Sequence, residues 1–141
     1  MVEINRTLLS VQSGYIIHQV NCQYKMGAGI AKDIRALYPR HYADYMASNL
    51  WLGNIVITNI SDNFGVIGIC AQDRYGRDRR YTDYDALEAC LVKIAKMKEF
   101  KPAMDFYMPK GMGCRTAGGD WAVVKDKLEK ITPFVILCKY N

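Results

Sequence analysis

Apolar residues gather along the chain in short runs, most of them the length of one strand. Several runs are apolar on both faces, the pattern of strands that helices cover on each side of a sheet. Because only Ser61-Asp62-Asn63 separates two of the runs, we expect a hairpin there and therefore a mixed sheet. The expected strands are Gly14–Val20, Asn54–Ile60, Phe64–Gln72, Met104–Met108 and Phe134–Lys139, with a short edge strand at Val2–Asn5.

Between these runs the apolar positions recur at helical spacing. Two helix starts are marked: Thr82 followed by Asp85 resembles a capping box, and Asp120 can cap a helix that begins at Trp121. Strands that alternate with helices predict a three-layer α/β/α sandwich with a mixed central sheet, whose ligands bind outside the carboxyl ends of the strands. The helical periods are Ile30, Ile34 and Leu37 before Pro39, then Leu87, Leu91 and Ile94 within Tyr84–Phe100, then Trp121, Val124, Leu128 and Ile131 before Pro133.

The length and composition fit one soluble domain. A chain of 141 residues suffices for one core, and we find no repeat or linker, so residues 1–141 are taken as a single domain. A hydrophobic share of 50% with 23% charged residues excludes wholesale disorder. No apolar stretch reaches membrane-spanning length and no signal-peptide pattern is found, so we expect a cytoplasmic protein without a membrane partner.

The net charge indicates the kind of partner, and the cysteine pattern indicates the redox compartment. The net charge of +5 favours anionic partners, and phosphate-bearing metabolites satisfy it as well as nucleic acid does. The five cysteines are widely spread, odd in number and never in a C-x-x-C pair, so we expect reduced thiols. Cys22 and Cys114 lie in polar loops with glycine, where a reactive thiol is the alternative to a structural one.

The segment from His18 to Pro39 joins an apolar strand, a polar turn, a glycine-rich bend and an amphipathic helix. Glycines 27 and 29 let backbone N–H groups approach an anion, and the positive end of the helix that begins near Gly29 faces the same place. The order therefore predicts a phosphate-binding loop. The alternative is an ordinary tight connection, since short glycine pairs also occur there.

A second loop repeats this arrangement. Met108–Trp121 leads from a strand through glycines at 111, 113, 118 and 119 to a helix that Asp120 can cap. Two such loops can close on one diphosphate from both sides.

A basic segment lies between the two loops. Asp73–Arg80 carries Arg74, Arg77, Arg79 and Arg80 interleaved with Tyr75. Arginine clamps phosphate and tyrosine can stack on a base, so the segment is a candidate for binding a phosphate or a nucleic-acid strand. The alternative is a solvated basic loop.

Three motifs together resemble the macro domain family of ADP-ribose-binding α/β/α modules. They are H-x-x-N…M-G-A-G-I-A (His18, Asn21, Met26–Ala31), Y-G-R…R-Y-T-D-Y (Tyr75–Tyr84) and G-x-x-A-G-G-D-W in the second loop. The resemblance covers nearly the whole chain and is greatest to the small single-domain ADP-ribose 1″-phosphatases of phages and fungi. It implies a monomeric hydrolase of ADP-ribose 1″-phosphate, in the host cytosol if phage-encoded, that needs no metal or cofactor.

The resemblance also assigns site residues. Asn21 corresponds to the asparagine that positions the distal ribose, and Asp120 lies near the terminal phosphate or the attacking water. The implied ligand-binding residues are Met26, Gly27, Ala28, Gly29, Ile30, Ala31, Gly111, Met112, Gly113, Cys114, Arg115, Thr116, Ala117, Gly118, Gly119, Gln72 and Tyr81.

Hydrolysis without a metal needs a group that orients or deprotonates water, and the sequence has no metal-ligand motif. Asp120 and His18 are the candidate acid–base groups, with Asn21 positioning a hydroxyl or water. The structural alternatives are an N-cap for Asp120, a strand residue with a backbone partner for His18, and a turn residue for Asn21.

The sequence departs from the family at two places. Asn5-Arg6-Thr7-Leu8 stands where relatives carry an acidic residue that binds adenine. No lysine occurs from Leu50 to Val92, and Ala117 replaces an aspartate, which disfavours the lysyl-adduct mechanism of relatives that remove ADP-ribose from macromolecules. Such removal from protein or nucleic acid is the first rival function, and ADP-ribose binding without turnover is the second.

Overall fold

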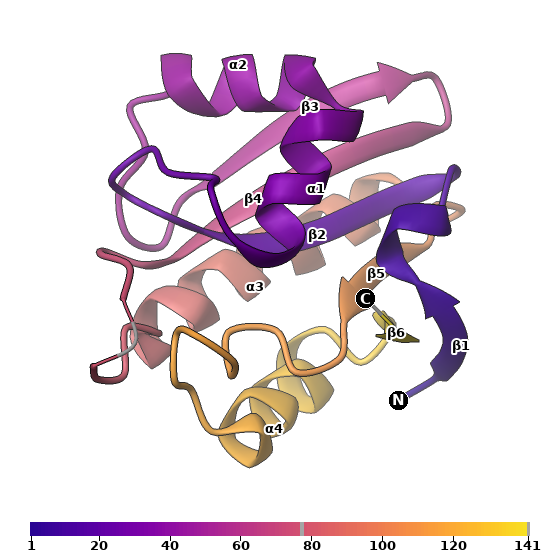
Figure 1. Cartoon of the computed structure of the whole chain (residues 1–141). Helices are drawn as coiled ribbons and strands as arrows, with labels where there is room; N and C mark the ends of the chain where they lie inside the picture. Colours follow the sequence, from indigo (N-terminus) through magenta and orange to yellow (C-terminus); the bar gives the residue numbers. More distant parts are fainter. Residues whose placement is uncertain (77, 141) are drawn as a thin grey trace.

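A mixed sheet of six strands forms the middle layer of the molecule (Figure 1). In this computed structural model, which describes residues 1–76 and 78–140, the strand order is β1-β6-β5-β2-β4-β3, and only β3 runs antiparallel to its neighbour. Helices α1 and α2 cover one face, and α3 and α4 cover the other. The expected α/β/α sandwich with a mixed sheet is therefore confirmed. The strands are β1 (Glu3–Thr7), β2 (Gly14–Asn21), β3 (Ile55–Ser61), β4 (Phe64–Gln72), β5 (Phe106–Pro109) and β6 (Ile136–Tyr140); the helices are α1 (Gly29–Leu37), α2 (Pro39–Ala47), α3 (Tyr84–Phe100) and α4 (Trp121–Ile131), with a 3-10 turn at Leu8–Ser10.

Strand β2 is buried on both faces because it lies between β4 and β5. Tyr15 and Ile17 pack in the cluster that α3 and α4 cover. Ile16 and Val20 pack in the clusters on the side of α1 and α2. Successive side chains of a strand point to opposite faces, so an unbroken apolar run here fills two cores.

Helix α2 was not predicted. Pro39 has no N–H to continue α1, yet it fits the first turn of a new helix, so the chain bends at Tyr38 and starts again. The buried side chains of α2 are His41 and Tyr45, which a search for aliphatic residues at helical spacing overlooks.

The predicted caps are half right. Asp120 caps α4 as expected, since its carboxylate accepts a hydrogen bond from the N–H of Ala122. At α3 the cap is Asp83, not Thr82, and it accepts from the N–H of Ala86. The Thr82 hydroxyl instead donates to the carbonyl of Gly113.

The expectation of five reduced cysteines is wrong for two of them. Cys22 and Cys70 form a disulfide, with their Cα atoms 6.4 Å apart. The parallel pairing of β2 with β4 brings them together, since Val20 lies opposite Cys70 and the chain turns just beyond it. Cys90, Cys114 and Cys138 are free thiols. Burial raises the pKa of Cys114 to about 11, so its thiol is protonated at neutral pH and is not the reactive group considered above.

No helix in the part of the chain that the structure describes is long and apolar enough to cross a membrane.

A buried histidine pair joins β2 to α2. The Nε2 atoms of His18 and His41 are 2.8 Å apart, and both residues are fully buried. His41 Nδ1 lies 2.9 Å from the hydroxyl of Thr58, which donates to Asp44. Gly68 lies opposite His18 on β4, and a Cβ there would lie only 3.0 Å from Cγ1 of Val56 and 3.2 Å from Cγ1 of Val20, so glycine allows the tight packing beside the pair.

The hydrogen bonds fix the tautomers of this pair. The Thr58 hydroxyl gives its proton to Asp44, so it accepts from His41 Nδ1–H. A neutral His41 then offers Nε2 as an acceptor, and His18 donates to it. This leaves His18 Nδ1 unprotonated, and within residues 1–76 and 78–140 that buried atom has no partner. Burial lowers the pKa of His41 to about 4 and that of His18 well below its usual value.

These pKa shifts make the folded protein sensitive to acid. An unfolded imidazole binds a proton below about pH 6.5, whereas the folded pair resists protonation until the pH nears 4. Stability is therefore complete above about pH 6.5 and falls as the pH is lowered. We expect urea unfolding to give a free energy lower at pH 5 than at pH 7 by roughly 2 kcal/mol from His41 alone, and the lowered pKa of His18 adds to this difference. The variant His18→Gln/His41→Gln should lose most of this difference, and an unchanged difference would contradict the assignment.

Candidate functional site

A cleft of about 840 Å³ opens at the edge of the sheet where β2, β4 and β5 end. Asn21, Gln72 and Pro109, the last residues of these strands, all lie in its wall. This edge carries the carboxyl ends of parallel strands, the place where α/β sheets bind ligands. The first wall comes from residues 24–31 with parts of α1 and α2, and the second from residues 109–117.

Asn21 holds the first wall in shape. Its Oδ1 accepts hydrogen bonds from the backbone N–H groups of Gln23 and Lys25, and its Nδ2 donates to the carbonyl of Lys25 at 3.0 Å. The Tyr45 hydroxyl, from α2, donates to both Asn21 oxygens at 2.5 and 3.0 Å. Burial raises the pKa of Tyr45 to about 12, so this donor stays protonated. Asn21 therefore shapes the loop, and its amide nitrogen keeps a second hydrogen for other partners.

The N-terminus of α1 faces the cleft without a side-chain cap. Ala28 is the N-cap, and no hydrogen bond from a described side chain satisfies the first turn. Gly29 has a φ of +59°, which favours glycine, and neither Gly27 nor Gly29 has a described atom within 4 Å of the position of a Cβ. The first N–H groups of a helix lack intrahelical partners, so this end offers donors and a positive dipole to a ligand.

The second wall is held from behind by hydrogen bonds. The Thr82 hydroxyl donates to the carbonyl of Gly113 at 2.6 Å, and the N–H of Gly119 donates to the same carbonyl at 2.9 Å. A Cβ at Gly113 would lie 2.6 Å from Oε1 of Gln19, whereas one at Gly111 would meet no described atom within 4 Å. Gly111 therefore faces the open cleft, and Gly113 allows a close approach to β2.

The charged side chains around the cleft are mostly basic. Lys25, Arg35, Lys110 and Arg115 line it against the single carboxylate of Asp33, among the residues that the structure describes. The Arg35 guanidinium lies 3.9 Å from the ring centre of Tyr42, which joins α1 to α2 at one end of the cleft. Such a lining attracts anions.

Most of the predicted ligand-binding residues line this cleft, but four do not. Cys114, Gly118, Gly119 and Tyr81 are absent from its wall. The N–H of Tyr81 bonds to the carbonyl of Ala117 at 2.7 Å, and a Cβ at Gly118 would lie 3.2 Å from the carbonyl oxygen of Arg79, so these residues join the second wall to the preceding loop. Those in the wall are Asn21, Met26, Gly27, Ala28, Gly29, Ile30, Ala31, Gln72, Gly111, Met112, Gly113, Arg115, Thr116 and Ala117.

The expectation that His18 lies beside the ligand is wrong. Its side chain points to the face of the sheet that α2 covers, where His41 accepts its hydrogen bond, and it is fully buried. The structural partner of His18 is therefore His41, which lies on the unpredicted helix α2.

Asp120 lies outside the cleft wall. Its carboxylate accepts from the N–H of Ala122, and its own N–H donates to the Tyr84 hydroxyl at 2.9 Å. The geometry thus gives Asp120 a capping role, and its catalytic role stays a prediction.

Sequence reasoning missed several residues of the cleft. Tyr42 and Met46 come from the unpredicted α2. Tyr75, which the sequence did indicate as a stacking residue of the basic segment but not as part of this site, lines the cleft and is 55% exposed. Its aromatic ring in an arginine-rich loop was the signal for such a role. The others are Gln19, Val20, Tyr24, Lys25, Asp33, Arg35, Pro109 and Lys110.

The fold and this cleft can be compared with known proteins. No protein-family model and no curated protein sequence matches the chain. A crystal structure of a protein from Bacteroides thetaiotaomicron is similar over 98% of this chain and 98% of its own, with a TM-score of 0.86 at 20% identity. The macrodomain of Mycobacterium tuberculosis DarG matches over 99% of this chain and 97% of its own, with a TM-score of 0.81 at 18% identity.

A third similar structure contains a bound ligand. The Trypanosoma brucei macrodomain, in complex with ADP-ribose, matches over 96% of this chain and 62% of its own, with a TM-score of 0.60 at 15% identity. These identities are low, and what the neighbours share with this chain is the arrangement of the sheet and its helices. The chain has the macrodomain fold.

Proposed function

We propose that the cleft binds ADP-ribose and that the protein hydrolyses ADP-ribose 1″-phosphate to ADP-ribose and inorganic phosphate. The observation that carries the binding is the uncapped, glycine-lined N-terminus of α1, which faces the open backbone at Gly111. The Trypanosoma brucei neighbour in complex with ADP-ribose supports the same ligand.

The cleft suits a diphosphate flanked by two sugars. Its volume of about 840 Å³ is in the usual range for a small-molecule site. Backbone N–H groups at the start of α1 can bind phosphate oxygens, and Lys25, Arg35 and Arg115 add positive charge. Glycines on both walls let the backbone reach the anion without a side chain between them.

For hydrolysis, we propose that water attacks the phosphorus and that the bond between phosphorus and the oxygen on C1″ breaks. The C1″ oxygen leaves with ADP-ribose and takes a proton from the phosphate that has received it from the water, so the products are the free C1″ hydroxyl and hydrogen phosphate. Because His18 is buried behind the sheet and the Asp120 carboxylate caps α4, we assign the proton of the water to the substrate's own phosphate dianion. The second amide hydrogen of Asn21 and the loop N–H groups hold the developing charge.

Two other functions could use the same cleft, and the products released distinguish them from the proposed phosphatase. A hydrolase that removes ADP-ribose from protein or nucleic acid would release free ADP-ribose but no phosphate. A binding module would release neither. Assays with both substrate types, run side by side, distinguish the three.

Valine at Gly27 tests the binding site with little effect on folding. Its Cβ would project into open space, and its backbone is outside the positive-φ region, so the melting temperature should stay within a few degrees of wild type. The side chain should occupy the place of the ligand and weaken ADP-ribose binding at least tenfold in a calorimetric titration. Ala36→Val, on an exposed part of α1 away from the cleft, is the matched control.

Normal affinity in Gly27→Val would refute the site. An equal loss in Ala36→Val would show that the effect arises from α1 as a whole.

Asp120→Asn separates capping from catalysis. Asparagine also caps helices well, whereas Asp120→Ala should lower the free energy of unfolding by about 1 kcal/mol. We expect phosphate release by Asp120→Asn within a few-fold of wild type. A loss on the order of a hundredfold at unchanged stability would instead establish Asp120 as a general base.

A further inference from the structure

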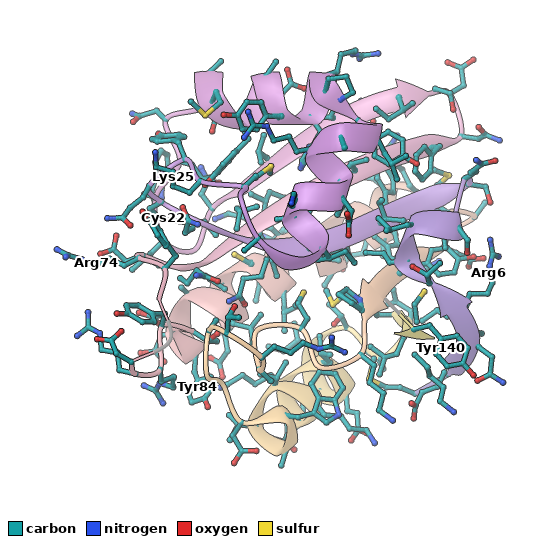
Figure 2. The ribbon with its side chains drawn as sticks, viewed as in Figure 1. Arg6, Cys22, Lys25, Arg74, Tyr84 and Tyr140 are labelled. Carbon is teal, nitrogen blue, oxygen red and sulfur yellow. A yellow bond between two sulfur atoms is a disulfide. The ribbon has the colours of Figure 1, made fainter. Side chains whose placement is uncertain are left out.

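The loop of residues 73–81, here called the arginine loop, contributes Tyr75 to the cleft wall and otherwise lies beside the cleft, and it has no role in the proposed hydrolysis. Of the four arginines noted in the sequence, Arg77 lies outside the described residues; Arg74, Arg79 and Arg80 are exposed. Figure 2 shows Arg74 extending away from the body of the protein on the same side as Cys22 and Lys25. The N–H of Cys22 bonds to the carbonyls of Gln72 and Asp73, so this side is also the side of the first cleft wall.

Two surface hollows flank the arginine loop. The first, of about 440 Å³, is lined by Arg74, Arg79 and Arg80 together with Asp73, Asp83 and Asp85. The second, of about 490 Å³, is lined by Arg79, Arg80 and Arg115 with one carboxylate, Asp78. The second hollow is therefore the more basic of the two.

The hollows form a continuous series with the cleft. Arg79 and Arg80 line both hollows, and Arg115 and Thr116 line the second hollow and the cleft. Next to an anion bound in the cleft, the surface thus offers further arginine side chains that could bind additional negative groups. A compact metabolite needs one such position, whereas an extended polyanion uses several.

The arginine loop is held in place by contacts that leave its cationic groups at the surface. The backbone N–H groups of Tyr81 and Thr82 bond to the carbonyl of Ala117 at 2.7 and 3.1 Å. The Arg79 guanidinium lies 4.9 Å from the ring centre of Tyr81, and that of Arg80 lies 4.3 Å from the ring centre of Tyr84. Asp78 accepts a hydrogen bond from the Tyr81 hydroxyl.

We propose that this series of hollows binds a single-stranded nucleic acid. Its phosphates contact Arg79, Arg80 and Arg115, and an unpaired base stacks on Tyr75, whose exposed ring lies at the edge of the cleft. The regularly spaced phosphates of a strand can contact several arginines at once. The Tyr75 ring can stack only on an unpaired base, because the base faces of a duplex are already stacked on one another. DNA and RNA strands share this chemistry.

Fluorescence anisotropy with labelled strands tests the proposal. The probes are unpaired deoxythymidine and uridine oligonucleotides of about 12 residues, within the length that single-strand sites cover. The variant Arg79→Ala/Arg80→Ala should bind them at least tenfold more weakly than wild type at low salt. The slope of log affinity against log salt should fall by about 1.4, since each lost phosphate contact on a single strand removes about 0.7.

The control removes two positive charges elsewhere. Lys96 and Lys101 are exposed at the far end of α3, so Lys96→Ala/Lys101→Ala has the same net charge as the double arginine variant. We expect it to bind the strands within about twofold of wild type. Tyr75→Ala should weaken binding several-fold, and Tyr75→Phe, which keeps the ring, should not.

Several results would overturn the proposal. The first is that wild type binds neither strand. The second is that Lys96→Ala/Lys101→Ala loses as much strand affinity as Arg79→Ala/Arg80→Ala. The third is that wild type binds a multiply phosphorylated peptide of the same charge more tightly than either strand. If Arg79→Ala/Arg80→Ala does not show a wild-type melting curve, Arg79→Gln and Arg74→Gln are compared instead, and strand binding unchanged in both would also refute it.

The proposal does not depend on the proposed hydrolysis. Arg79 and Arg80 do not line the cleft, so their variant should bind ADP-ribose normally, while Gly27→Val should still bind the strands through the arginine loop. Failure of one site is thereby distinguished from failure of the other.

Discussion

The position of β2 between β4 and β5 is the constraint on which the site depends. Because all three strands are parallel, their carboxyl ends meet at one edge, and the loops that follow them must begin there. The glycine loop after β2, the arginine loop after β4 and the second glycine loop after β5 therefore surround one cleft. The same pairing places Cys22 beside Cys70.

The loops stay open because side chains behind them satisfy their backbone. Asn21 bonds to the backbone of Gln23 and Lys25 from beneath the first wall, and Thr82 bonds to Gly113 from behind the second. Among the residues described, the first turns of α1 and α2 have no side-chain cap, and it is α1 that begins in the wall of the cleft. Asp83 and Asp120 cap α3 and α4. The helix that faces the cleft thus keeps its donors for a ligand, whereas the helices on the other face do not.

The strands and the glycine loops could be predicted from the sequence, because apolar runs and closely spaced glycines act locally. The remaining features depend on contacts between distant residues. The sequence could not show that His18 has a structural partner, because His41 lies 23 residues away. That partner is on α2, which was not predicted because it begins at Pro39 and its buried side chains are His41 and Tyr45. The disulfide joins residues 48 positions apart and follows only from strand order. Asp120 was correctly predicted to cap, yet the sequence could not show that its carboxylate lies outside the cleft wall.

The central claim is that ADP-ribose lies between the two glycine loops, on the N-terminus of α1. Amide chemical shifts in a ¹⁵N-labelled sample, recorded as ADP-ribose is added, test it most directly. The account predicts that the largest changes fall on residues 27–31 and 111–117, with small changes at the His18–His41 pair and on the exposed part of α3. Saturable changes confined to other surfaces, with both loops unaffected, would contradict it.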